Sequence, residues 1–165
     1  MRRLSEEDVD TVSLAARELG GHKPRSQYER YLSEQGQGVR GVLVAYLDGV
    51  FAGYVTLNRR SDYTPFRDGG IPEIQDLNVL PRLRRRGVAT RLMERVERVA
   101  FGESNVIGIG VGLTPDYGPA QRLYVLHGFV PDGEGLMLNG RPVLRGEEVL
   151  LDDAVLYMTK VSRPV

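Results

Sequence analysis

The chain has 165 residues, a length that fits one domain and is awkward for two. Its 22 Lys and Arg residues balance 22 Asp and Glu residues, whereas a dedicated nucleic-acid-binding protein is usually more basic. Cysteine is absent, which excludes disulfides, a thiol nucleophile and Cys-ligated metal centres. With two histidines, a multi-histidine metal site within one chain is not expected either.

No apolar run approaches the roughly 20 residues of a membrane span, and the N-terminal MRRLSEED is too polar for a signal peptide. The composition, with 41% hydrophobic and 27% charged residues, is that of an ordinary globular protein. We therefore expect one soluble, cytoplasmic domain over residues 1–165, without a metal and without a membrane or nucleic-acid partner.

Two helices are predicted near the N-terminus. Ser5 precedes three acidic residues, as a helix N-cap does, and apolar residues at 9, 12, 16 and 19 form one helical face. Gly20-Gly21 is expected to end this helix, and a second helix is expected from about Ser26 to Glu34.

A β-hairpin follows the helices. Strands over 42–47 and 50–57 flank Asp48-Gly49, which favours the positive φ angles of a tight type I′ turn. Residues 59–72 contain Pro and Gly and are interpreted as a loop.

The rest of the chain alternates strands with helices. The clearest element is a helix from Gly87 to Phe101, whose apolar residues recur at helical spacing, and Asn139-Gly140 indicates a further turn. The remaining expected elements are strands over 71–79 and 106–113, a helix over 119–127, a strand at 129 and a last strand over 155–160. This order predicts a mixed sheet with helices on both faces.

The stretch from Leu77 to Thr90 is the most informative, because a strand runs into a loop that opens a helix. Free N–H groups at a helix N-terminus attract anions, and Gly87 lets a ligand approach the backbone closely. Arginines at 82, 84, 85 and 86 surround the same turn. From spacing alone, a phosphate site, a solvated basic turn and a nucleic-acid surface all remain open.

A second glycine-rich stretch does not match a nucleotide motif. Gly108, Gly110 and Gly112 are followed by Leu113, so the final glycine of a dinucleotide fingerprint is missing. Alternate residues of a strand point to one face, which leaves that face bare. Close approach of a ligand or another backbone explains this pattern, and tight helix packing explains it equally well.

In the stretch from Leu77 to Thr90 the sequence resembles the GNAT superfamily of acyl-CoA-dependent N-acyltransferases. Val79-x4-Arg84-x2-Gly87-x-Ala89 matches the family signature of a strand valine, four residues, Arg or Gln, two residues, Gly, one residue, and Gly or Ala. Downstream, the stretch from Ala120 to Phe129 matches a second family element, Ala-x-x-Leu-Tyr-x-x-x-Gly-Phe. The two motifs and the order of elements extend the resemblance over nearly the whole chain.

The resemblance implies a fold and a reaction. The fold is an α/β twisted mixed sheet of six or seven strands, in which strands 4 and 5 splay apart and hold acyl-CoA between them. Pantetheine would pair along Leu77, Asn78 and Val79. The pyrophosphate would lie on the backbone of Arg84, Arg85, Arg86, Gly87, Val88, Ala89 and Thr90. The implied reaction transfers an acetyl group from acetyl-CoA to a primary amine of a small molecule or peptide, through a tetrahedral intermediate.

The reaction needs a base, because an alkylammonium of pKa ~10.4 must lose its proton before it attacks. By the resemblance Glu73 is the candidate, with Asp76 as the runner-up and water ordered by a carboxylate as a further possibility. Strand alternation would place Glu73 and Gln75 on one face and Asp76 on the other. The alternative for Glu73 is a surface or salt-bridged carboxylate.

The leaving thiolate benefits from an acid, and Tyr124 matches the family's acid position. The alternative is a core tyrosine, since Ala120, Leu123 and Tyr124 share a helical face. Tyr117 stands where the family often has Asn, and His127 is expected at an exposed helix end.

The acceptor groove of the family would include the loop that carries Tyr63 and Phe66, which are candidate substrate-binding residues. The segment from 132 to 153 contains six acidic residues and two arginines, so it has a net negative charge. It either attracts a basic acceptor or is a solvated charged surface. The competing functions are an acyl-CoA-sensing or partner-binding module without turnover and a nucleic-acid binder that uses the helix after Arg82. A homodimer is common in the resembling family.

Overall fold

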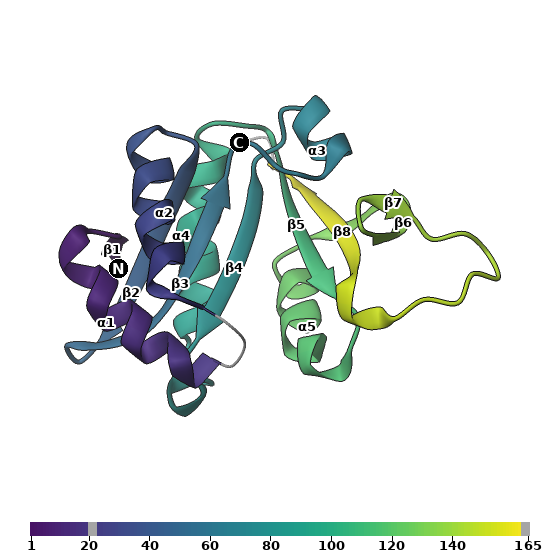
Figure 1. The fold of residues 1–165 in the computed structure, drawn as a ribbon. Helices are drawn as coiled ribbons and strands as arrows, with labels where there is room; N and C mark the ends of the chain where they lie inside the picture. Colours follow the sequence, from purple (N-terminus) through teal and green to yellow (C-terminus); the bar gives the residue numbers. More distant parts are fainter. Residues whose placement is uncertain (20–22, 163–165) are drawn as a thin grey trace.

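The protein consists of one mixed β-sheet with helices on both faces (Figure 1). The structure is a computed structural model, which describes residues 1–19 and 23–162. The strands are β1 (Arg2–Arg3), β2 (Arg40–Leu47), β3 (Val50–Asn58), β4 (Glu73–Val79), β5 (Val106–Gly112), β6 (Val130–Leu138), β7 (Arg141–Pro142) and β8 (Ala154–Val161). The α-helices are α1 (Val9–Ala15), α2 (Arg25–Gly36), α3 (Thr64–Asp68), α4 (Val88–Phe101) and α5 (Gly118–Leu126). Across the sheet the strand order is β1-β2-β3-β4-β5-β8-β6-β7.

The predicted α/β architecture is confirmed, with eight strands in place of six or seven. The shortest strands, β1 and β7, have two residues each, too few to show an alternating pattern in the sequence. Both predicted tight turns form, since φ is positive at Asp48 and Gly49 and again at Asn139 and Gly140. The predicted helix end at Gly20-Gly21 lies outside the described residues.

Helices cover the two faces of the sheet unequally. In Figure 1, α1 and α2 lie on one face of β2–β4 and α4 lies on the other. The β4–α4–β5 and β5–α5–β6 connections cross over in the same direction, so α5 shares the face of α4. The amphipathic pattern of α4 is confirmed, because most of its apolar residues are buried; the buried ones are Val88, Leu92, Met93, Val96 and Ala100.

Strands β4 and β5 diverge, as the resemblance implied. They pair in parallel at Glu73 with Gly108 and at Ile74 with Ile109, whereas β4 continues to Val79 and β5 to Gly112. Figure 1 shows the two strands moving apart beyond this paired end. We call the space between them the split.

A β-bulge interrupts the alternation of β4. Tyr54 pairs with Asn78 but Thr56 pairs with Gln75, so β4 contains one extra residue, and Asp76 has a φ of 51°. The extra residue reverses the faces beyond it. The expectation that Asp76 and Gln75 point to opposite faces is therefore wrong.

The side-chain contacts show this reversal directly. The hydroxyl of Tyr31, on α2, donates a hydrogen bond to Asp76 Oδ2. Arg40 Nη1 donates to Gln75 Oε1 over 3.0 Å, and the Arg40 guanidinium lies 4.8 Å from the centre of the Tyr31 ring. Asp76 and Gln75 thus both reach toward α2.

The segment 59–72, interpreted as a loop, contains the short helix α3. Pro65 lies in its first turn, where a proline is tolerated because the N–H it lacks has no helical acceptor. Phe66 of α3 is buried with Tyr63 and Met137 in a small hydrophobic cluster separate from the main core. The Phe66 ring of this cluster covers Gly108 on the bare face of β5.

Candidate active site

The loop between β4 and α4 forms an open cradle of backbone amides. Gly87 adopts a left-handed conformation, with φ of 77°, and α4 begins at Val88. The first helical hydrogen bond runs from Arg91 N–H to the Gly87 carbonyl over 3.1 Å, so the N–H groups of residues 88–90 have no intrahelical acceptor. A Cβ added at Gly87 would meet nothing within 4 Å. The amides are therefore accessible to an anion.

Arginine side chains surround the cradle. Arg84, Arg85 and Arg86 are exposed, and Arg85 has a positive φ of 57°. Together with the N-terminal end of the α4 dipole, they make the site electropositive. The sequence-based assignment of this turn to a phosphate group is compatible with the geometry.

The end of β4 borders the split. Within the described residues the ladder between β4 and β5 stops at Ile74, so the β5-facing edge of Leu77, Asn78 and Val79 has no strand partner. An edge of this kind can pair with an extended ligand through its backbone groups. The three residues predicted to hold pantetheine thus lie where an amide-containing chain could reach them.

Tyr124 is the buried residue of α5, with 6% of its surface exposed. Its ring packs at a tilt against Phe129, with the ring centres 6.3 Å apart. Burial, together with the smaller effects of the nearby Tyr117 and Asp76, raises the pKa of Tyr124 to about 12. The phenol is therefore protonated near neutral pH and can act as a hydrogen-bond or proton donor.

Glu73 lies at the closed end of the split, opposite Gly108 in the paired register. It is 5% exposed, and Ser61 Oγ donates a hydrogen bond to its carboxylate. Burial raises the pKa of Glu73, and the neighbouring Asp62 acts in the same direction. The carboxylate is thus a stronger base than a solvated glutamate, but it is not open to solvent.

Asp76 lies farther along β4, at the bulge, and is half-buried. Its charge contributes to the raised pKa of Tyr124, and also to those of Tyr31 and Tyr54 after the larger effect of burial. The structure therefore brings Asp76 into the same electrostatic environment as Tyr124. Glu73 instead groups with Ser61.

Tyrosines around Asp76 were not identified from the sequence. The hydroxyls of Tyr28 and Tyr54 are buried and have no partner among the described residues, and their rings meet edge to face with centres 5.7 Å apart. Tyr28 and Tyr31 are three residues apart in a predicted helix, so their shared face was a usable signal. The position of Asp76 next to these tyrosines could not be predicted, because the spacing of residues in β4 does not reveal the bulge.

Tyr63 and Phe66, the candidate substrate residues, are both buried. Tyr63 stacks on Tyr157 with ring centres 3.7 Å apart and donates a hydrogen bond to Asp132 Oδ2 over 2.8 Å. A role for these rings in shaping the split stays a prediction.

The bare face of β5 is filled by aromatic side chains. A Cβ added at Gly108 would lie 2.2 Å from the Phe66 ring, and one at Gly112 would lie 2.5 Å from the Tyr117 ring. Close approach of a ligand or another backbone and tight helix packing were the expected reasons for these glycines. Helix packing is confirmed at Gly108, because the Phe66 ring of α3 occupies the space there. At Gly112 the space is occupied by the Tyr117 ring from the turn before α5.

Two charged groups differ from their expected setting. His127 is not exposed, since its side chain is 12% accessible and its Nδ1 lies 2.7 Å from Glu97 Oε1. In the acidic segment, Glu147 pairs with Arg141 and accepts a hydrogen bond from the Leu144 N–H, and these contacts lower its pKa to about 2. Part of the acidic segment is thus neutralised within the chain.

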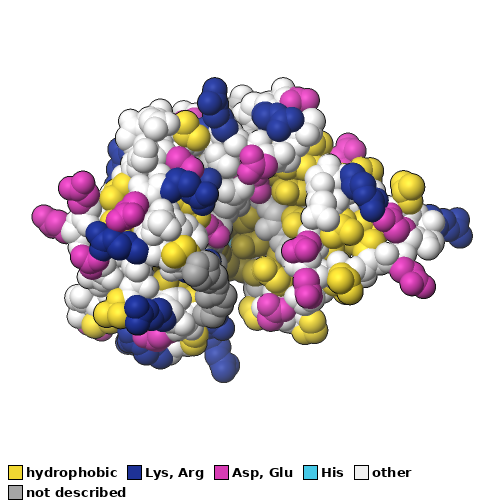
Figure 2. All heavy atoms as spheres, viewed as in Figure 1, with side chains coloured by type: hydrophobic (Ala, Val, Ile, Leu, Met, Phe, Trp, Pro, Cys, Tyr) yellow, Lys and Arg dark blue, Asp and Glu magenta, His cyan; other side chains and the backbone are white. Residues whose placement is uncertain are grey.

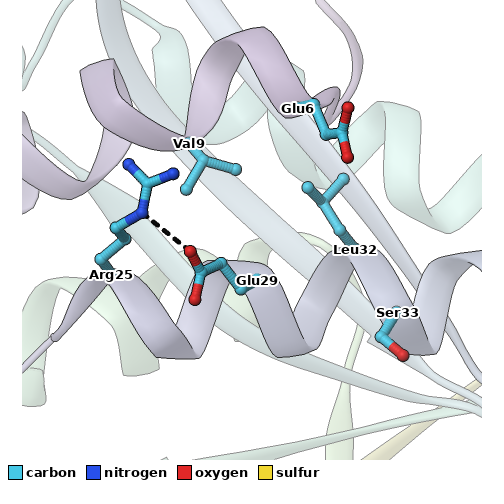
Figure 3. A pocket seen from close by; sticks show the side chains of 6 residues that line it. All are labelled: Glu6, Val9, Arg25, Glu29, Leu32 and Ser33. Atoms are coloured by element: carbon cyan, nitrogen blue, oxygen red, sulfur yellow. Dashed lines mark hydrogen bonds and ion pairs between the residues drawn. The ribbon is translucent and has the colours of Figure 1, made fainter.

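The molecular surface is hollowed at the split. Figure 2 shows a hollow between the part built on β1–β4 and the part built on β5–β8, with hydrophobic side chains on its floor. A separate groove of about 710 Å³ lies between α1 and α2 (Figure 3). Its lining residues are Glu6, Val9, Arg25, Glu29, Leu32 and Ser33, none of which is a predicted site residue.

No helix in the described part of the chain has the length and apolar character to cross a membrane. Among the same residues, no cluster of three or more His, Asp or Glu side chains is arranged to hold a metal ion.

Comparison with known proteins identifies the family. The model of the acetyltransferase (GNAT) family matches residues 9–129. Among curated proteins, none matches the sequence.

Several solved structures share the fold. They include an N-acetyltransferase from Staphylococcus aureus Mu50 (TM-score 0.73, 14% identity, covering 97% of this chain and 96% of that one). The ribosomal-protein-alanine N-acetyltransferase from Brucella melitensis is also similar (TM-score 0.71, 17% identity, 98% of each chain). A third is the PaiA N-acetyltransferase from Thermoplasma acidophilum in complex with coenzyme A (TM-score 0.68, 14% identity, 98% of this chain and 97% of that one). The family match spans more than half of the chain and agrees with the split sheet and both motifs, so this protein belongs to the GNAT family and is an acetyltransferase.

Proposed function

We propose that the protein transfers an acetyl group from acetyl-CoA to a primary amine. The observation that carries this proposal is the amide cradle of residues 87–90, which opens beside the unpaired edge of β4. A donor with an anionic pyrophosphate next to an amide-rich arm fits both features at once. The residues proposed to hold it are those predicted from the sequence, from Leu77 to Val79 and from Arg84 to Thr90.

Tyr124 is the proposed general acid. Its raised pKa of about 12 keeps it protonated, and a coenzyme A thiolate, with a conjugate acid of pKa ~8.5, leaves more readily when it gains a proton. Tyr124 is buried on α5, close enough to Asp76 for the Asp76 charge to affect its pKa, and this placement at the split supports the role.

Two carboxylates are proposed to act on the amine. Deprotonating an alkylammonium at pH 7 costs about 4.6 kcal/mol, so the reaction gains from a base. Glu73 remains the proposed base because burial raises its pKa, and its hydrogen bond with Ser61 offers a route for the proton. Asp76, which is less buried and shares the environment of Tyr124, is proposed to hold the ammonium group.

Calorimetric titration with acetyl-CoA tests the donor site. We expect micromolar binding that weakens at least tenfold in Gly87→Glu and in Thr90→Glu, because each adds a negative charge at the cradle. Thr90→Glu adds no backbone strain, and an acidic residue in the first turn stabilises a helix, so it separates lost binding from misfolding. Gly36→Glu is the matched control, since a Cβ there meets nothing within 4 Å.

Thiol release from acetyl-CoA over a panel of diamines, polyamines and peptides with free α-amines tests turnover. Release with at least one amine supports the proposal. Tight binding of acetyl-CoA without release in the whole panel would support the acyl-CoA-binding module instead. Undiminished binding in both cradle variants would show that the donor lies elsewhere.

A further inference from the structure

A buried ionic cluster lies outside the proposed active site. Glu97 of α4 is 8% exposed, although it carries a carboxylate. Its Oε1 lies 2.7 Å from His127 Nδ1, and Lys160 Nζ donates a hydrogen bond to its Oε2 over 2.6 Å. Because a carboxylate only accepts hydrogen bonds, His127 Nδ1 carries the proton that they share. The Lys160 ammonium also lies 5.8 Å from the ring centres of Phe101 and Phe129.

The cluster joins the two sides of the split. Glu97 belongs to α4, which packs on β3 and β4, whereas His127 follows α5 and Lys160 lies on β8, on the other side. The β4–β5 ladder that also joins the two sides consists of two residue pairs. One carboxylate of α4 therefore supplies polar contacts to both elements across the split.

Apolar contacts hold one face of helix α5, where Ala120, Leu123 and Tyr124 pack against the main core. The C-terminal end of the helix has less packing, since Val125 and Leu126 are 61% and 68% exposed. At its first turns, Gln121 Nε2 donates to the Gly112 carbonyl over 2.8 Å. At the C-terminal end of α5, the hydrogen bond between His127 and Glu97 joins the helix to α4.

His127 caps the end of α5, three residues after Tyr124, which is about one helical turn. A displacement of this end would therefore move the Tyr124 ring. We infer that the Glu97–His127 pair is a positioning device that sets the Tyr124 hydroxyl relative to the donor held by α4. This inference rests on the proposed function, because it takes Tyr124 as the general acid.

The test compares His127→Ala with His127→Asn. Alanine removes the donor, whereas the Asn side-chain amide can occupy the place of Nδ1 and restore the hydrogen bond. We expect His127→Ala to lower kcat at least tenfold with the acetyl-CoA Kd changed less than about twofold, and His127→Asn to recover most of the loss. Arg122→Ala, an exposed position on α5, is the matched control.

Hydrogen exchange of residues 118–127 gives a readout independent of turnover. The inference predicts faster exchange there in His127→Ala and a return toward the wild-type rate in His127→Asn. Unchanged exchange and unchanged kcat in His127→Ala would overturn it, as would an equal loss of kcat and acetyl-CoA affinity in both variants. If the wild-type protein turns over no amine, the proposed function fails and the exchange of α5 alone decides whether the pair positions the helix.

Discussion

The hydroxyl of Tyr31 on α2 donates a hydrogen bond to the carboxylate of Asp76 at the bulge of β4. Asp76 has a φ of 51°, a left-handed conformation that costs an ordinary residue about 1 kcal/mol. The Asn78 side chain also donates to the Asp76 carbonyl over 3.1 Å. Both contacts hold Asp76 in this conformation at the edge of the split, where we propose that it holds the ammonium group of the amine.

Asp76→Asn is expected to weaken binding of the amine. Asn tolerates the left-handed conformation, so the bulge persists, but the charge that would attract an ammonium group is lost. The KM for the amine should rise at least tenfold while the acetyl-CoA Kd stays within about twofold. Steady-state kinetics with the exposed Asp68→Asn as control checks this, and an unchanged KM would remove Asp76 from the acceptor site.

Glu73→Gln is expected to separate activity from stability. In the wild type, activity should rise with pH as Glu73 loses its proton. In the variant this rise should be absent, and kcat should be at least tenfold lower. Because burial raises the pKa of Glu73 in the folded state, ionisation of Glu73 opposes folding: the stability due to its protonated form is present at low pH and is lost as the pH rises through the folded pKa.

Relative to the wild type, Glu73→Gln should therefore gain stability at pH 7, and this gain should disappear at pH 4, where Glu73 is protonated and uncharged as well. The pH profile of kcat and thermal unfolding at both pH values measure the two effects. A stable variant with normal turnover would show that Glu73 is not the base.

Tyr124→Phe tests the general acid with little change in packing. The ring and its contact with Phe129 remain, and the hydroxyl is lost. We expect kcat to fall at least tenfold with an unchanged acetyl-CoA Kd, because the thiolate would leave without a proton. Thiol-release kinetics combined with calorimetry give both numbers, and Tyr117→Phe is the control for a neighbouring phenol. Equal turnover by Tyr124→Phe and wild type would return Tyr124 to a packing role.

Gly108→Ala tests the aromatic cover of β5. The new Cβ would lie 2.2 Å from the ring of Phe66, which is 1% exposed. Overpacking of this kind costs about 1–3 kcal/mol of unfolding free energy. Gly36→Ala should instead stabilise the protein by about 0.4–1 kcal/mol. Gly36 is the last residue of α2, and alanine fits there without strain because the added Cβ meets nothing within 4 Å. Urea unfolding compares the stability of the two variants. An unchanged midpoint for Gly108→Ala would mean that the Phe66 ring moves aside at no cost.

Local patterns determined much of the fold. The apolar spacing of α4, the Asp-Gly and Asn-Gly turns and the glycine that opens the cradle follow from rules that act within a few residues. The two motifs also led to the split sheet, since they identify a family whose strands diverge. The cradle was therefore predictable down to Gly87 and Val88.

Contacts between distant residues were decided only by the tertiary structure. The bulge at Asp76 depends on the pairing of β4 with β3, and the burial of His127 depends on Glu97 of another helix. The glycine face of β5 is covered by the rings of Phe66 and Tyr117, and no spacing within the strand indicates these two partners. Periodicity reports which face of an element is apolar, but the partner that covers that face is a property of the assembled sheet.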